Sequence, residues 1–216
     1  MTDLYLQENS SVLKNPLGIT DEKELDLAEA ELSRANMMLL YEKGFSDFSV
    51  GGICFIHKEL FGDVYEWAGE FRKINIQKRE KILAGLSVWY SNDTDIERDL
   101  IKAWKNINKV SWAKLSKDEF VEKVTRLFPA IWQVHPFREG NTRTVVMLIT
   151  FFVEHYGYLF DQEIISANAG YVRNAFVLAS LGEYSEYDDL EAILKDAICD
   201  KPADFETDFN NSNEKS

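Results

Sequence analysis

One short segment contains most of the side chains that could do chemistry, and it reads His135-Pro136-Phe137-Arg138-Glu139-Gly140-Asn141-Thr142-Arg143. The imidazole of His135 can accept a proton near neutral pH. The carboxylate of Glu139 offers the hard oxygens that Mg²⁺ binds, usually together with phosphates of a substrate. Arg143 can hold a phosphate through paired hydrogen bonds. Together these side chains are typical of a site for phosphoryl or nucleotidyl transfer.

The backbone of this segment is predicted to form a helix, a tight loop and a second helix. Pro136 disfavours the α conformation at His135, so the preceding helix should end there. Gly140 and Asn141 readily adopt positive φ or cap a helix, and the apolar run 144–153 follows. The first turn of the second helix would present unpaired N–H groups and the positive end of its dipole, which bind phosphate.

Each of these features also has a purely structural explanation. A histidine beside a proline often only ends a helix, and a Gly-Asn pair is usually a turn or a cap. Glu139 and Arg143 could form a solvated ion pair of small value. Phe137 anchors the loop in the core under either interpretation. Spacing alone therefore leaves both interpretations open.

The composition is that of a globular protein. A chain of 216 residues with 45% hydrophobic residues can bury a core as one domain. Its net charge of -13 argues against nucleic acid as a partner. Cys54 and Cys199 are too few for a disulfide framework, which favours a reducing, cytoplasmic setting, although one bridge between them is an alternative. No signal peptide is visible, and the run 144–153 is too short to cross a bilayer, so no membrane partner is expected.

The elements that position the loop are predicted to be helices. The first has an apolar stripe of Leu25, Ala28, Leu32, Ala35 and Leu39. Two of the predicted helices begin at capping boxes: one at Thr94 and Glu97, and one at Ser116 and Glu119, which runs through Trp132 and is kinked by Pro129. The other predicted helices cover 21–42, 47–60, the apolar segment after Thr142, 170–181 and 188–199.

Residues 71–90 are the exception. Ile74 and Ile76 alternate with polar residues, and further apolar residues follow the charged turn 78–81. This pattern predicts a short β-hairpin, with a surface loop as the alternative. The predicted fold is therefore all-α with one hairpin. Residues 1–20 would form an N-terminal arm, 21–200 the domain, and 201–216 a disordered acidic tail.

The loop resembles the signature of the Fic (Fic/Doc, or Fido) family, His-x-Phe-x-Asp/Glu-Gly-Asn-x-Arg, with every specified position filled. Residues 56–72 resemble the family's upstream segment, and 73–77 resemble the strand of its flap. The resemblance extends over roughly 17–199. It implies a helical Fic core with a hairpin flap beside the active site, and transfer of AMP from ATP to a Ser, Thr or Tyr hydroxyl of a protein substrate.

The resemblance also implies roles for individual residues. His135 would deprotonate the target hydroxyl, and Glu139 would bind Mg²⁺. Tyr171, otherwise an ordinary core or rim aromatic, and Asn174 would lie beside adenine. The nucleotide-binding residues of the loop would be Arg138, Glu139, Gly140, Asn141, Thr142 and Arg143, with 140–142 as the anion hole and Arg143 on the departing β-phosphate. The flap residues Ile74, Asn75, Ile76, Gln77 and Lys78 would pair with the protein substrate by strand addition.

Two positions depart from the commonest family form. Thr142 stands where Gly is usual, and its hydroxyl could donate to a phosphate oxygen. Val146 stands where a second Arg contacts the γ-phosphate and pairs with an inhibitory glutamate in the family. A strict preference for ATP is therefore open.

The family's inhibitory segment reads Ser/Thr-x-x-x-Glu-Gly/Asn. Thr20 with Glu24 and Thr150 with Glu154 have the spacing, but the wrong residue follows each pair. We therefore expect no inhibitory glutamate within the chain and regulation in trans, with an inhibitory antitoxin as a candidate partner. A glutamate within salt-bridge distance of Arg143 would contradict this expectation.

Three classes of function remain. AMP transfer is favoured and requires a His135 ring that faces an open cleft. A Doc-like kinase would transfer the γ-phosphate, but such proteins typically have Lys at the position of Thr142; transfer of another nucleotide or phosphodiester-linked group is a further variant. A nucleotide-binding adaptor without activity is favoured by Val146 and disfavoured by the intact His135 and Glu139. A cytoplasmic location is expected, with delivery to another cell as the alternative.

Overall fold

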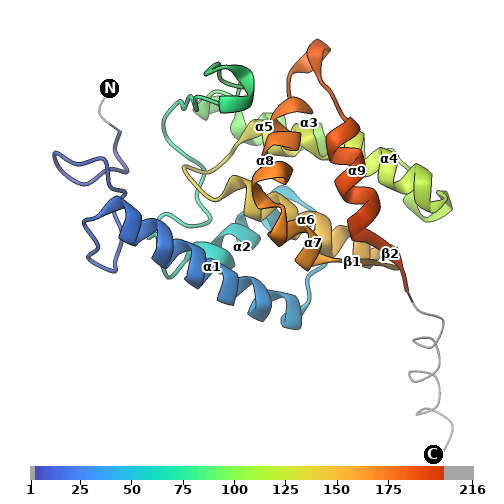
Figure 1. Cartoon of the computed structure of the whole chain (residues 1–216), viewed down its shortest axis with the longest axis horizontal. Coiled ribbons are helices and arrows are strands. Elements are labelled where there is room, and N and C mark those ends of the chain that lie inside the picture. The colour runs from blue at the N-terminus through green and yellow to red at the C-terminus, as the bar shows by residue number, and fades with distance from the viewer. Residues whose placement is uncertain (1–2, 202–216) are drawn as a thin grey trace, which may run out of the picture.

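The computed structural model describes residues 3–201 (Figure 1). The mostly helical fold predicted from the sequence is confirmed. Of the predicted tail, all but Lys201 lies outside the described residues. The helices are α1 (Glu22–Lys43), α2 (Val50–Phe61), α3 (Ile96–Ile107), α4 (Lys117–Leu127), α5 (Pro129–Val134), α6 (Asn141–His155), α7 (Gln162–Ala167), α8 (Ala169–Leu178) and α9 (Asp188–Ala197).

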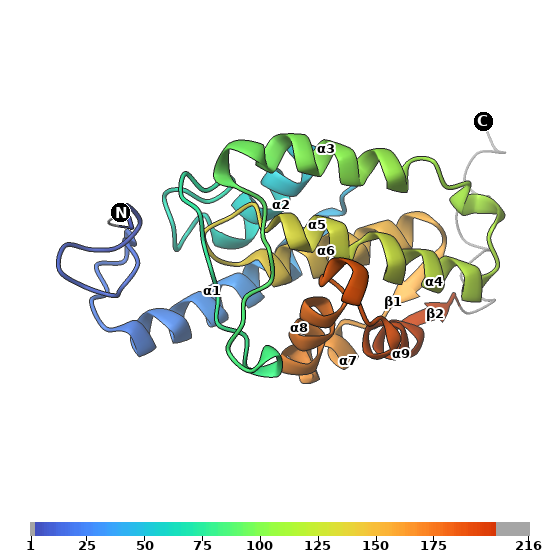
Figure 2. The same ribbon diagram turned by 90° about the horizontal axis from the view of Figure 1, so that it is seen from above.

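Helix α6 is the buried centre of the fold. Every side chain from Thr144 to Val153 is buried, and α2 and α5 pack against it. In Figures 1 and 2 the other helices surround it. A helix that is apolar on all sides must be enclosed in this way. Its first turn, at Asn141, is consequently held in a fixed position relative to the core.

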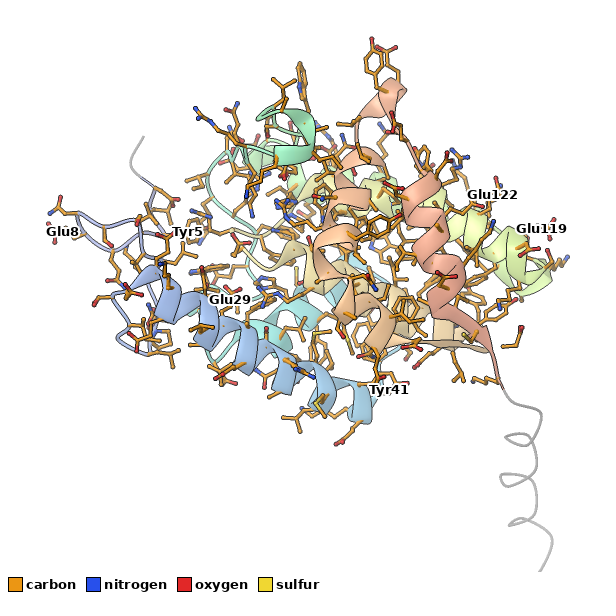
Figure 3. The ribbon with its side chains drawn as sticks, in the orientation of Figure 1. Tyr5, Glu8, Glu29, Tyr41, Glu119 and Glu122 are labelled. Carbon is orange, nitrogen blue, oxygen red and sulfur yellow. The ribbon has the colours of Figure 1, made fainter. Side chains whose placement is uncertain are left out.

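Helix α1 packs against α2 with a face that coincides only in part with the predicted stripe, of which Leu25 is buried and Ala28 and Leu32 are half-buried. Ala35 and Leu39 of the predicted stripe are exposed, whereas the polar residues Glu29 and Ser33 are buried. Figure 3 shows Glu29 on the side of α1 that is turned toward the body of the molecule. The helix is rotated because these two polar side chains bind a residue of the loop described below.

The two predicted capping boxes have different outcomes. Ser116 and Glu119 form both hydrogen bonds of a capping box at the start of α4. Thr94 and Glu97 do not form one, because a 3₁₀ turn at Asp93–Asp95 leads directly into α3 without a side-chain cap. The helix itself is present, so only its start was wrong.

Residues 71–90, which we call the flap, contain no strand, and the predicted β-hairpin is not formed. The flap is a loop with two limbs that reaches across to α8, with a 3₁₀ turn at Lys81–Leu83 near its tip (Figure 2). The Glu80 N–H donates to the Leu86 carbonyl at 3.0 Å, and the Lys78 N–H donates to Ser87 Oγ at 3.2 Å. With so little backbone pairing, the flap depends on side-chain contacts for its position.

A small sheet is present elsewhere and was not predicted. Strand β1 (Tyr158–Phe160) pairs antiparallel with β2 (Ile198–Asp200). The last residues of the predicted helix 188–199 therefore belong to a strand. Cys54 and Cys199 are free thiols, so the alternative of a bridge is wrong. No helix within residues 3–201 is long and apolar enough to span a membrane.

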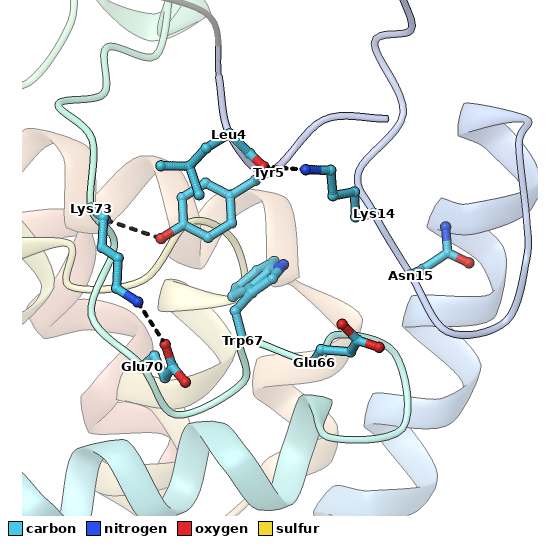
Figure 4. Close-up of a pocket in the computed structure, with 8 residues that line it drawn as sticks. All are labelled: Leu4, Tyr5, Lys14, Asn15, Glu66, Trp67, Glu70 and Lys73. Atoms are coloured by element: carbon cyan, nitrogen blue, oxygen red, sulfur yellow. Dashed lines mark hydrogen bonds and ion pairs between the residues drawn. The ribbon is translucent and has the colours of Figure 1, made fainter. Parts of the chain in front are cut away.

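Residues 3–21 form an arm that contacts the base of the flap. The buried Tyr5 packs edge-on against Trp67, with ring centroids 5.3 Å apart, and its hydroxyl accepts a hydrogen bond from the Lys73 N–H at 3.0 Å. Lys73 also pairs with Glu70 at 3.1 Å. These residues border a cavity of about 410 Å³ between arm and flap (Figure 4). The arm thus fixes the point at which the flap leaves the domain.

Candidate active site

The loop between α5 and α6 has the predicted backbone. Pro129 occupies the first position of α5, where its missing N–H costs little. The helix ends at His135, which has the left-handed angles φ 51° and ψ 60°. Gly140, with φ 78°, precedes α6 as its N-cap. Positive φ is uncommon for residues other than glycine, and such strained residues cluster at functional sites.

His57 of α2 anchors this loop. Its ring stacks on Phe137 with centroids 3.7 Å apart. Its Nδ1 accepts a hydrogen bond from the Gly69 N–H at 2.8 Å, so the proton of the neutral ring is on Nε2, which donates to the Glu139 carbonyl at 3.1 Å. Sequence reasoning gave His57 no role, although a histidine on the apolar face of a helix was a usable signal.

Arg72 holds the loop from the side of the flap and was also missed. Its side chain is only 1% exposed. Its Nε donates to the His135 carbonyl at 2.8 Å, and its terminal nitrogens donate to the carbonyls of Ile74 and Ser91. One guanidinium therefore joins the C-terminus of α5 to the first limb of the flap and to the residue that follows its second limb. A cation at that position is also favoured by the dipole of α5.

Asn141 stabilises the loop through its side chain. Its Nδ2 donates to the Phe137 carbonyl at 2.9 Å, and its Oδ1 accepts from the Phe137 N–H at 3.0 Å. Only its backbone could therefore contribute to an anion hole. Within residues 3–201, the N–H groups of Asn141, Thr142 and Arg143 have no hydrogen-bond acceptor. The first turn of α6 thus keeps its capacity to bind an anion.

Thr142 is held from the core side of the loop. Its Oγ1 accepts a hydrogen bond from the indole Nε1 of Trp132 at 2.9 Å. The hydroxyl proton is not needed for that bond. Donation from Thr142 to a phosphate oxygen remains a prediction.

The His135 side chain does not face an open cleft, and that expectation was wrong for this structure. The side chain is 2% exposed, because the Tyr90 ring of the flap covers it at a centroid distance of 4.2 Å. Nδ1 lies 3.3 Å from the Trp132 carbonyl. Nε2 is buried and has no partner among the described residues. An unpaired buried polar atom is rare and requires an explanation.

The protonation state of His135 suits a base. Burial, together with the nearby Lys78 ammonium, holds the pKa of His135 well below its usual range. The ring is therefore neutral at pH 7. Its Nδ1 is placed to donate to Trp132, which leaves the Nε2 lone pair free to accept a proton.

Glu139 is bound by a lysine of the flap. Lys78 Nζ lies 3.1 Å from both carboxylate oxygens, and Arg138 lies 3.9 Å away. Burial opposes ionisation, but the charges of Lys78 and Arg138 outweigh it and lower the pKa of Glu139. Glu139 is therefore a charged carboxylate that already binds a cation.

The described residues fit a metal ion that arrives with a nucleotide. Among residues 3–201 no three histidine, cysteine or acidic side chains form a cluster that could hold a metal by themselves. Mg²⁺ commonly binds through one carboxylate together with substrate phosphates and water. Glu139, beside the open amides of α6, provides such a carboxylate.

Arg143 forms an ion pair with Glu29 of α1, which contradicts the expectation that no glutamate of the chain reaches it. Its Nη1 also donates to Ser33 Oγ at 2.6 Å, and the guanidinium lies 4.8 Å from the centre of the Phe61 ring. Glu29 is buried and accepts a further hydrogen bond from Tyr65. Arg143 is thus held by the protein's own groups.

Glu29 escaped notice because it does not fit the inhibitory pattern. Leu25 stands four residues before it, where the pattern has Ser or Thr, and Ala30 follows it. The fold nevertheless places its carboxylate on the loop. An antitoxin as a partner remains a prediction, but the absence of an internal glutamate no longer supports it.

The remaining predicted residues are dispersed. Arg138 turns to the arm and pairs with Asp3 at 2.8 Å. Tyr171 is exposed and donates to the Asp189 carbonyl at 3.3 Å, on the side of α9. Asn174 is half-buried. Within the described part of the chain, no hydrogen bond or ion pair joins Tyr171 or Asn174 to the loop, and their contact with adenine remains a prediction.

Instead, Arg173 connects α8 to the site. It binds the buried Glu80 of the flap through two contacts of 2.5 and 2.9 Å. The Tyr90 hydroxyl donates to the same carboxylate at 3.2 Å. Arg173, Glu80 and Tyr90 therefore form a chain of contacts that ends on the His135 ring. The sequence suggested none of these pairings.

The buried histidines lead to a pH prediction. Burial lowers the pKa of His57 to about 3, and the pKa of His135 is lowered as well. Below pH 6.5 the unfolded chain therefore binds protons that the folded chain does not, and stability is lost as the pH falls. Between pH 6.5 and 5.5 we expect the free energy of unfolding to decrease by roughly 1 kcal/mol for each histidine.

Urea denaturation at the two pH values measures this loss. In the variant His57→Gln the loss should be about half that of the unmodified protein, since one of the two groups is removed. An equal loss in both proteins would show that His57 does not titrate as its burial requires.

Comparison with known proteins places this site in a family. The model of the Fic/DOC family matches residues 47–153. The chain is 31% identical to the probable protein adenylyltransferase y4lH of Sinorhizobium fredii over 70% of this chain and 75% of that protein. It is 29% identical to the protein adenylyltransferase VbhT of Bartonella schoenbuchensis over 89% of this chain, but it spans only 38% of the length of that relative.

Solved structures give the same fold. The BepC protein of Bartonella tribocorum, solved with bound AMPPNP, superposes with a TM-score of 0.78 at 22% identity, over 92% of this chain and 97% of that one. The Fic domain of a cell filamentation protein of Bartonella quintana, solved with bound ADP, superposes with a TM-score of 0.77 at 23% identity, over 91% and 95% of the two chains. With the loop of residues 135–143 preceding a buried helix, these relationships show that the chain belongs to the Fic/DOC family.

Proposed function

We propose that this protein transfers AMP from ATP to a hydroxyl group of another protein, with His135 as general base. One observation carries the proposal. A neutral imidazole with an unpaired Nε2 lies beside a helix N-terminus whose first amides have no protein acceptor. The names of the adenylyltransferase relatives, and the adenine nucleotides bound by two structural neighbours, support the same reaction.

In the proposed reaction, Nε2 of His135 takes the proton of the target hydroxyl. The hydroxyl oxygen bonds to the α-phosphorus of ATP, and the bond from that phosphorus to the oxygen bridging to the β-phosphate breaks. Pyrophosphate leaves and AMP remains on the target protein. The proton on Nε2 is later released to solvent or to the leaving group.

The loop stabilises the charge that develops in this step. The N–H groups of residues 141–143 are oriented by α6 and need no rearrangement to bind phosphate oxygens. Glu139 would hold the Mg²⁺ that accompanies ATP, and this metal would neutralise part of the phosphate charge. Arg143 would contact the departing β-phosphate, which requires it to leave Glu29 or to share its guanidinium with both partners.

Access to His135 requires the flap to move. Tyr90 covers the ring, and residues 74–78 have no strand geometry to which a target could add. Strand addition by the protein substrate therefore depends on a rearrangement of that limb. His135 is thus already neutral, as a general base must be, before Tyr90 moves away from its ring.

The proposal is tested with labelled ATP. The protein is incubated with Mg²⁺, cell lysate and ATP labelled at either the α- or the γ-phosphate. The variant His135→Asn is run in parallel, because kinases of the lysate also transfer γ-label. We expect protein-bound label that depends on His135 from the α position only. Label that depends on His135 and comes from the γ position only would indicate a kinase instead, and no label that depends on His135 would favour the adaptor.

A further inference from the structure

The contact between Lys78 and Glu139 assigns a second role to the flap. Lys78 Nζ is 3.1 Å from both oxygens of the carboxylate. The two side chains are 23% and 35% exposed, so solvent screens them only in part. An ion pair with both oxygens engaged and partial burial is stronger than an ordinary surface pair.

A metal ion on Glu139 and the present position of Lys78 compete with each other. A divalent cation that approached Glu139 from the side that Lys78 faces would take the lone pairs to which Lys78 now donates. It would also repel the ammonium at that distance. A metal bound on that side of Glu139 would therefore displace the lysine.

Displacement of Lys78 would affect the part of the flap that is expected to bind the target. Lys78 is the last residue of the limb 74–78. The limb is also held by the bond from Arg72 to the Ile74 carbonyl, by the Asp93 N–H, which donates to Asn75 Oδ1 at 2.9 Å, and by the bond from the Lys78 N–H to Ser87 Oγ. The flap tip has its own attachment through Glu80 and Arg173. Loss of the Lys78 contact would thus remove the ion pair that ties the end of the limb to the active-site loop and loosen that end, while the tip stays in place.

We propose that Lys78 is a built-in counter-cation that occupies Glu139 until a metal–nucleotide complex displaces it, so that nucleotide loading releases the limb 74–78 for the protein substrate. This inference rests on the proposed function, because it takes Glu139 to be the metal ligand. It makes binding ordered, with the metal and nucleotide first and the target second.

The variants Lys78→Met and Lys81→Met test the inference. Both remove one positive charge from the flap, but Lys81 is exposed and its side chain does not contact Glu139. The affinity for Mn²⁺ in the presence of ADP is measured by the electron paramagnetic resonance of free Mn²⁺. Hydrogen exchange of the flap amides is measured with and without Mn²⁺ and ADP.

We expect Lys78→Met to bind Mn²⁺ with ADP roughly 10-fold more tightly than the unmodified protein. Without ligand, the backbone amides of residues 74–78 in Lys78→Met should exchange hydrogen as rapidly as those of the unmodified protein do with Mn²⁺ and ADP. Lys81→Met should match the unmodified protein in both measurements. Unchanged exchange in α6 shows that the variants are folded.

Equal or weaker Mn²⁺ binding by Lys78→Met would overturn the inference, and weaker binding would show that Lys78 contacts the nucleotide instead. Unaltered or slower exchange of the limb on loading would also overturn it. Neither measurement involves AMP transfer. A protein that shows the predicted competition but labels no target would therefore refute the proposed function and leave this inference intact.

Discussion

Replacement of His135 by Asn is expected to lower the rate of AMP transfer by about 10²- to 10⁴-fold, the usual cost of removing a general base. Asn is the suitable replacement because it tolerates the left-handed backbone at this position better than Ala does. It cannot accept a proton at neutral pH. The rate is measured as incorporation of α-labelled AMP into protein at saturating ATP.

Binding of Mg²⁺–ADP should be nearly unchanged in this variant, since under the proposed function the phosphates would be held by α6 and not by the imidazole. His155→Asn is the matched control, because His155 is exposed at the opposite end of α6. Its rate should equal that of the unmodified protein. Activity retained within tenfold in His135→Asn would rule out the imidazole as the base.

Replacement of Gly140 by Ala should strongly reduce stability. An added Cβ would lie 2.5 Å from the Phe61 ring, and the backbone has φ +78°. Phe61 is fully buried in the core. Left-handed strain and overpacking together should cost about 3 kcal/mol of unfolding free energy, as measured by urea denaturation.

Gly157 separates these two contributions. It follows the other end of α6 with φ +92°, but a Cβ there would meet nothing within 4 Å. Gly157→Ala should therefore cost only about 1 kcal/mol, the strain alone. If the two variants lost the same stability, close packing of Gly140 on Phe61 would not be what fixes the loop.

The variant Gly140→Ala should also affect nucleotide binding. The same Phe61 ring lies under the guanidinium of Arg143. A shift of that ring would move Arg143 relative to the amides of α6. Loss of nucleotide affinity is therefore expected to accompany the loss of stability in Gly140→Ala, and not in Gly157→Ala.

Local sequence signals predicted the backbone of the site well. Pro136 ends α5 at His135, Gly140 takes positive φ, and the run 144–153 forms a buried helix. Each of these outcomes is decided by one or two neighbouring residues or by a long apolar pattern. Such signals do not depend on how the rest of the chain folds.

Contacts between distant segments could not be predicted in this way. Glu29 reaches Arg143 and Lys78 reaches Glu139 only because the fold brings together segments that are far apart in the sequence. The alternation of Ile74 and Ile76 resembles a strand, but the flap is held by side chains instead of by a paired strand: Arg72 and Glu139 hold the limb 74–78, and Arg173 holds the tip. Side-chain anchors thus overrode a weak propensity for strand.

The ion pair between Glu29 and Arg143 bears on how this protein is regulated. The Glu29 carboxylate already neutralises the arginine expected on the departing phosphate. Under the proposed function a nucleotide would compete with Glu29 for Arg143, and a metal would compete with Lys78 for Glu139. In this structure each of the three charged side chains of the loop that would bind a nucleotide is paired with a side chain of opposite charge from another segment: Arg138 with Asp3, Glu139 with Lys78 and Arg143 with Glu29.

The most direct test of the account is the chemical identity of the group left on a target. A protein from the lysate that takes up α-label is isolated, and its modified peptide is sequenced by tandem mass spectrometry. We predict one AMP group, in phosphodiester linkage to a Ser, Thr or Tyr oxygen, that is absent when His135→Asn replaces the active protein. A single phosphoryl group at that oxygen, or an AMP adduct that forms equally with His135→Asn, would contradict the account.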